Sequence, residues 1–117
     1  MDELKIETLK GASGASILRL TGPLTIQSLF EFQDLCRKES SPAIVLDLSG
    51  VPYMDSAGLG AVLGVLASCQ RHGRGFGVAG VTDRIRTLFA VSRVAGMIPL
   101  FDSVELAESK LQKSVSA

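Results

Sequence analysis

The segment AIVLDLSGVPYMDSAGLGAVLGVL, residues 43–66, decides the fold class. Its first six residues, Ala43 to Leu48, form a short and nearly unbroken apolar run. Such a run is typical of a strand that is covered on both faces. From Leu59 onward, apolar residues recur at the i, i+3, i+4 and i+7 spacing of one helix face. A buried strand that leads into an amphipathic helix predicts an α/β fold, with this strand in the middle of the sheet.

The sequence before this segment predicts a hairpin and a helix. Residues 4–9 and 16–20 alternate between apolar and polar side chains on either side of a Gly- and Ser-rich turn. A helix is then expected to start at Thr25, a plausible N-cap, and to end near residue 40. Its apolar face is predicted to contain Ile26, Leu29, Phe30, Gln33 and Cys36.

The sequence after the segment predicts two further strand and helix units. The expected elements are a buried strand at residues 76–79, a helix capped by Thr82 or Asp83, an edge strand at residues 97–101 and a helix at residues 104–111. The predicted order is therefore β-β-α-β-α-β-α-β-α in one α/β domain with a mixed sheet. We expect this domain to span residues 1–113 and a frayed tail to occupy residues 114–117.

Composition excludes several classes of protein. Hydrophobic residues make up 46% of the 117-residue chain and charged residues 21%, which is too apolar for a disordered chain. Twelve Lys and Arg balance twelve Asp and Glu, so no net field favours nucleic acid or an anionic membrane. No apolar stretch approaches the ~20 residues of a membrane span, and the start lacks a secretory signal pattern. We expect a cytoplasmic protein with reduced thiols at Cys36 and Cys69.

The loop between the central strand and its helix, residues 53–60, is the candidate functional segment. It places Ser56 near the first helical turn at the carboxyl end of a strand, where open α/β sheets commonly carry functional groups. Either Asp55 or Ser56 can cap the helix. Small neighbours such as Gly58 and Gly60 would let another protein reach the hydroxyl group of Ser56. From these residues alone, the favoured interpretation of Ser56 is a simple N-cap.

A family resemblance points to a function for this loop. The run Met54-Asp55-Ser56-Ala57-Gly58-Leu59-Gly60 resembles the D-S-[SA]-G-L-G signature of the STAS family of bacterial anti-sigma factor antagonists. The similarity extends through residues 22–24, 44–48 and 81–101. It implies that an anti-sigma serine kinase phosphorylates Ser56, that the unmodified protein binds this kinase, and that a PP2C-type phosphatase reverses the modification. The predicted partner contacts are Tyr53, Met54, Asp55, Ser56, Ala57, Gly58, Leu59 and Gly60.

One position departs from the family pattern and supports an alternative. The family commonly has Asp before the first helix, where this chain has Thr25. If that Asp helps to position the serine loop or the kinase, phosphorylation here would be slower, differently recognised or absent. The alternative is a stand-alone STAS subunit that acts as a constitutive scaffold in a membrane-associated transport complex or another signalling assembly.

Other motifs do not support an enzyme or a cofactor site. The glycines of residues 75–80 match G-x-G-x-x-G, but they follow a predicted helix and contain a strand, the reverse of a dinucleotide site. His72, the only histidine, would lie about 24 Å along the helix from Ser56, too far for a catalytic pair. Cys69 and His72 give only two ligands of a tetrahedral metal site. We therefore expect no catalytic residue, cofactor, metal, nucleic-acid contact or membrane insertion.

Overall fold

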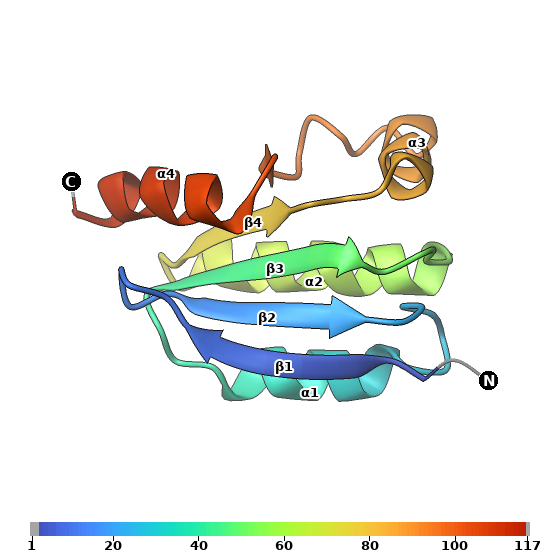
Figure 1. Cartoon of the computed structure of the whole chain (residues 1–117), viewed down its shortest axis with the longest axis horizontal. Coiled ribbons are helices and arrows are strands. Elements are labelled where there is room, and N and C mark those ends of the chain that lie inside the picture. Colours follow the sequence, from blue (N-terminus) through green and yellow to red (C-terminus); the bar gives the residue numbers. More distant parts are fainter. Residues whose placement is uncertain (1–2, 117) are drawn as a thin grey trace.

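The computed structural model describes residues 3–116, and the side chains of residues 3–111, as an α/β fold (Figure 1). Its five strands are β1 (Lys5–Lys10), β2 (Ser16–Thr21), β3 (Ala43–Gly50), β4 (Gly75–Ala79) and β5 (Leu100–Phe101). They form one mixed sheet in the order β1-β2-β3-β4-β5, in which only the β1 and β2 pair is antiparallel. The helices are α1 (Leu29–Lys38), α2 (Ser56–Arg71), α3 (Asp83–Val91) and α4 (Val104–Ser116). The predicted fold class and element order are confirmed.

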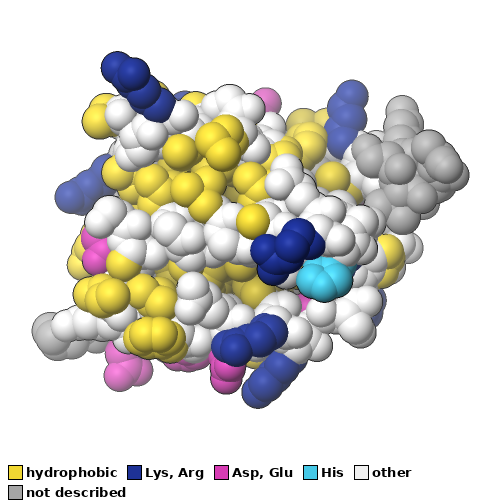
Figure 2. All heavy atoms as spheres, turned by 180° about the vertical axis from the view of Figure 1, so that it is seen from behind, with side chains coloured by type: hydrophobic (Ala, Val, Ile, Leu, Met, Phe, Trp, Pro, Cys, Tyr) yellow, Lys and Arg dark blue, Asp and Glu magenta, His cyan; other side chains and the backbone are white. Residues whose placement is uncertain are grey.

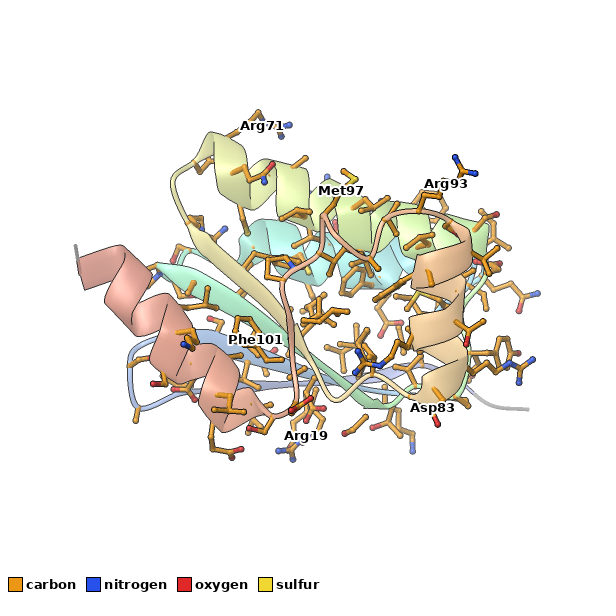
Figure 3. The ribbon with its side chains drawn as sticks, turned by 90° about the horizontal axis from the view of Figure 1, so that it is seen from above. Arg19, Arg71, Asp83, Arg93, Met97 and Phe101 are labelled. Carbon is orange, nitrogen blue, oxygen red and sulfur yellow. The ribbon has the colours of Figure 1, made fainter. Side chains whose placement is uncertain are left out.

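The hydrophobic core lies mainly between the sheet and the pair α1 and α2. All six residues from Ala43 to Leu48 are buried, as expected for a strand covered on both faces. The predicted face of α2 packs against them through Leu59, Val62 and Leu66. A smaller cluster fills the opposite face under α4, where Phe101 packs (Figure 3). Within residues 3–116, no helix combines the length and the apolar character needed to cross a bilayer.

The first helix begins later than the sequence pattern predicted. Residues 26–28 form a turn, and α1 starts at Leu29 with Ser28 at the N-cap position. The predicted N-cap role of Thr25 is therefore wrong, because its hydroxyl oxygen accepts a bond from the amide of Gln27 at 3.3 Å instead. The predicted apolar face is also partly wrong, since Ile26 is 58% exposed and Phe30 is 72% exposed. The buried residues of α1 are Leu29, Phe32 and Cys36.

The C-terminal elements also differ from the prediction. The expected edge strand at residues 97–101 is reduced to Leu100 and Phe101, because Met97 and Ile98 donate their amides to the Val94 carbonyl in a turn. The frayed tail expected at residues 114–117 stays a prediction, since α4 continues as far as Ser116 and Ala117 lies outside the described residues. The domain boundary at residue 113 stays a prediction.

The helix α3 ends on a residue in an unusual conformation, which leads to a first testable prediction. Arg93 has φ 61°, and the amides at residues 93 and 94 bond back to Ala90 and Phe89, as in a Schellman cap. Glycine is favoured at this position because a β-carbon disfavours left-handed backbone. We expect Arg93→Gly to raise the free energy of unfolding by about 1 kcal/mol in urea denaturation. Ala90→Gly, inside the same helix, should lower it by a similar amount, about 1 kcal/mol. A loss of stability in Arg93→Gly would contradict this reading of the cap.

Candidate functional site

Ser56 is the first residue of α2 and lies exposed beyond the carboxyl end of β3. The preceding residue, Asp55, is the N-cap, and its Oδ1 accepts a 2.8 Å hydrogen bond from the amide of Gly58. Of the two capping residues that the sequence allowed, Asp55 therefore does the capping. Within the described residues, the hydroxyl of Ser56 has no hydrogen-bond partner. This hydroxyl is thus open to solvent and is not used to hold the fold together.

Asp55 also ties the Ser56 loop to the loop before α1. Its Oδ2 accepts a 3.1 Å bond from the amide of Ile26. The two loops run in parallel, because the Leu24 amide donates to the Tyr53 carbonyl at 3.2 Å and the Leu24 carbonyl accepts from the Asp55 amide at 3.4 Å. One carboxylate and two backbone bonds therefore fix the position of Ser56 relative to residues 24–26.

The hydrogen bonds to Asp55 also keep its carboxylate ionised. The amide of Gly58 is the main group that holds the pKa of Asp55 below its ordinary value, against the opposing effect of partial burial. The amide of Ile26 acts in the same direction. A negative charge is therefore present beside Ser56 at neutral pH.

The fold itself requires glycine at position 58, and access for a partner does not. A β-carbon at this position would lie 2.1 Å from the carbonyl oxygen of Leu24, closer than any non-bonded contact allows. Gly58 is also buried, so the earlier interpretation that it lets a partner approach is corrected. Gly60 fits that interpretation, because it is exposed and a β-carbon there would have no neighbour within 4 Å.

Burial divides the eight predicted contact residues into two groups. Met54, Gly58 and Leu59 are buried, which corrects their assignment as direct partner contacts. The residues with exposed or half-buried surface are Tyr53, Asp55, Ser56, Ala57 and Gly60. The sequence interpretation missed Ile26 and Phe30, which it had placed in the core. Positions 29, 32 and 36 already form one helix face. Assigning only these three to the core would have left Ile26 and Phe30 on the surface.

Thr25 and Arg84 border the site without contacting the Ser56 hydroxyl. The amide of Thr25 donates to Ser28 Oγ at 3.1 Å, so Thr25 belongs to the turn before α1. Arg84, in the first turn of α3, places its guanidinium carbon 5.3 Å from the centroid of the Tyr53 ring. This cation–π contact orients the ring of Tyr53 at the edge of the site.

The double role of Asp55 leads to a prediction about stability and pH. Asp55→Ala removes a helix cap and the bond to Ile26, so we expect it to lower the free energy of unfolding by about 1 to 2 kcal/mol at pH 7. Because the folded pKa of Asp55 is depressed, its contribution is complete above about pH 4 and is lost as the pH falls through the folded pKa.

Urea denaturation at pH 7 and at successively lower pH checks this expectation, and the gap between wild type and Asp55→Ala should shrink with acid. Asp102→Ala is the control, because Asp102 is exposed and its carboxylate accepts no comparable hydrogen bond within the described residues. A gap that widens with acid would contradict the capping role of the Asp55 carboxylate.

Comparisons with known proteins show the family and the fold of the chain. Residues 6–107 match the sequence model of the STAS domain. The chain is 26% identical over 92 residues to an anti-sigma-B factor antagonist of Staphylococcus aureus, covering 76% of this chain and 85% of that protein. The crystal structure of an anti-sigma factor antagonist from Mycobacterium paratuberculosis superposes with a TM-score of 0.84 at 19% identity, covering 94% of this chain and 95% of that one. The phosphorylated form of the Bacillus cell fate determinant SpoIIAA superposes with a TM-score of 0.69 at 16% identity, covering 90% and 98%.

Proposed function

Because the chain belongs to the STAS domain family, we propose that it is an anti-sigma factor antagonist whose binding to a partner is controlled by phosphorylation of Ser56. The main observation that supports this proposal is the exposed hydroxyl of Ser56, which has no hydrogen-bond partner among the described residues. In this scheme an anti-sigma serine kinase adds the phosphoryl group and a PP2C-type phosphatase removes it. The chain itself contributes no catalytic residue.

The surroundings of Ser56 suit phosphoryl transfer by another protein. The neighbouring Ala57 is small, and Gly60, one turn further along α2, leaves open space above the helix. A kinase active site can therefore approach the hydroxyl without displacing a bulky side chain. A phosphoryl group at this first helical position would lie near backbone amides of the first turn that lack helical partners. The fold should therefore accept the modification.

We infer that exposed residues of the Ser56 loop and of the segment before and at the start of α1 form a binding surface. We call it the Ser56 surface and define it as Ile26, Phe30, Tyr53, Ser56 and Gly60. Its three large side chains are exposed, and Figure 2 shows hydrophobic groups gathered on this side of the molecule, where α1 and α2 face outward. Exposed apolar side chains of this kind mark protein interaction sites. In the unmodified protein, a partner would bury these groups together with the neutral hydroxyl.

Phosphorylation would change the charge of this surface without changing the fold. The phosphoryl group adds about −1.5 to −2 charges. It would lie beside the carboxylate of Asp55, which is already ionised. A partner packed over Ser56 would have to remove water from both charges, which opposes binding. The cost of removing water from these two charges would therefore release the partner.

Mapping of phosphorylation sites by mass spectrometry tests the proposal. The protein is isolated from its source cells under several growth conditions and digested. We expect phosphate on Ser56 and none on Thr25 or on Ser68, a half-buried serine further along α2. Protein that stays unmodified at Ser56 in every condition, and that co-purifies with transport subunits, would favour the constitutive scaffold instead.

A further inference from the structure

The end of α3 and the turn after it expose large apolar side chains outside the Ser56 surface. Val91, the last residue of α3, is 76% exposed, and Met97, in the turn before β5, is 60% exposed. Val91 lies three residues beyond the half-buried Leu88, so the two share one face of α3. Figure 3 shows Met97 on the side of the molecule to which α2 faces outward. Exposed apolar groups of this size mark an interaction site.

The outward face of α2 lacks the charges of an ordinary solvated helix. α2 has no acidic residue, and its only charged residue, Arg71, is in the last turn. The outward positions in its middle are the half-buried Leu63 and the exposed Gly64. By contrast, α1 exposes charged side chains from Glu31 to Lys38. A helix that is uncharged on all sides is normally covered. The middle of α2 is therefore suited to contact with another molecule.

These parts of α2 and α3 form one surface, which we call the α2–α3 surface. Leu63 of α2 and Leu88 of α3 pack against the same core cluster, so the core links the two helices beneath the surface. Figure 2 shows hydrophobic groups on either side of the uncharged middle of this face. We define the surface as Leu63, Gly64, Leu88, Val91, Arg93 and Met97.

The shape of α2 at this surface suits a second helix. A β-carbon on Gly60 or Gly64 would meet nothing within 4 Å, so this stretch of α2 is open. Gly60, Gly64 and Ser68 follow one another at a spacing of four residues, and such a row of small residues is a groove that receives the side chains of a packed helix. Beside Gly64, a groove of about 270 Å³ hollows the surface towards α1. A helix is therefore the element that this shape accommodates best.

The charge of the surface favours an acidic partner. From residue 84 to residue 101 the charged residues are Arg84, Arg86 and Arg93, and none is acidic. Arg93 is exposed, makes no ion pair within the described residues and lies on the same side as Met97 in Figure 3. A symmetric second copy would bring these arginine-rich segments together, which opposes self-association. Acidic side chains of another protein would instead pair with Arg93.

We propose that the α2–α3 surface binds an amphipathic helix of another protein. The apolar face of that helix packs on Leu63, Gly64 and Met97, and acidic side chains on its flank pair with Arg93. The surface adjoins the Ser56 surface, because Gly64 is about one turn beyond Gly60 on α2. The inference does not rest on phosphorylation of Ser56, since no residue of the α2–α3 surface changes its charge in that reaction.

NMR titration of the ¹⁵N-labelled protein with synthetic peptides tests the proposal. The probe is a helical peptide of 16 residues, the length of α2, with leucine on one face and glutamate on its flanks. We expect saturable shifts at the amides of Gly64 and Met97. The same peptide with lysine in place of glutamate should bind about tenfold more weakly at low salt. Equal affinities of the two peptides would overturn the proposal. A dimer in sedimentation with neither peptide bound would also overturn it and assign the surface to a second copy.

Two variants then separate the charge from the apolar contact. Arg93→Glu should lower the preference for the glutamate peptide by about threefold or more, whereas Lys10→Glu, at an exposed lysine of β1, should leave it unchanged. Met97→Ser should weaken the binding of both peptides about tenfold. Its control is Leu106→Ser, at a leucine of α4 that is 49% exposed, which should bind like wild type. Unchanged affinity in Met97→Ser, or equal effects of Arg93→Glu and Lys10→Glu, would overturn the proposal.

Discussion

Gly58→Ala is expected to lower the free energy of unfolding by about 2 to 4 kcal/mol, although alanine is the better helix former. The added β-carbon would lie 2.1 Å from the carbonyl oxygen of Leu24 and 2.9 Å from its carbonyl carbon. Leu24 is fully buried, and its backbone bonds to Tyr53 and Asp55. It cannot move away without breaking the contacts that place the Ser56 loop. The clash therefore outweighs the gain in helix propensity.

Gly60→Ala provides the matched control for this prediction. It makes the same chemical change two residues further along α2, where a β-carbon would meet nothing within 4 Å. We expect it to raise the free energy of unfolding by up to about 1 kcal/mol. Urea denaturation of the two variants and the wild type measures the difference. Equal effects of the two substitutions would contradict the proposed packing of Gly58 against Leu24.

Ser56→Asp is expected to weaken partner binding by roughly two to three orders of magnitude, equivalent to about 3 to 4 kcal/mol. The new carboxylate would lie beside the ionised Asp55, on the Ser56 surface, whose large apolar side chains are exposed. Burying both charges against a partner loses their hydration. Ser56 makes no hydrogen bond that the fold requires within the described residues, so the stability of the variant should stay close to that of wild type.

Two further variants separate the position of the charge from its presence. Gln70→Glu adds a negative charge at an exposed site near the other end of α2, and its partner affinity should match that of wild type. Ser56→Ala adds no charge and should also bind. Isothermal titration calorimetry with the isolated partner gives the affinities. Weakening of similar size in Gln70→Glu would mean that net charge, and not the Ser56 surface, controls binding.

Local sequence patterns were sufficient to predict the centre of the fold. The unbroken apolar run of β3 and the helical spacing in α2 arise from burial of neighbouring residues, so they can be read within one short window. The position of Ser56 at the start of α2 followed from the same two elements. The choice of Asp55 as cap was left open, because Asp and Ser are both favoured at that position.

The features that the sequence did not predict depend on contacts between distant segments. The bond from Ile26 to Asp55 spans 29 residues, and the packing of Gly58 against Leu24 also joins two separate loops. No local pattern contains such information. The late start of α1 has the same origin, because residues 24–26 are held beside the Ser56 loop and are not free to join the helix.

Capture of partners from a lysate of the source organism tests the central claim most directly. Wild-type protein and Ser56→Asp are immobilised in equal amounts, with Gln70→Glu as the control, and bound proteins are identified by mass spectrometry. The switch account predicts that wild type and Gln70→Glu retain a serine kinase or anti-sigma factor and that Ser56→Asp loses it. Retention of the same transport subunits by all three proteins would contradict the switch and establish a constitutive scaffold.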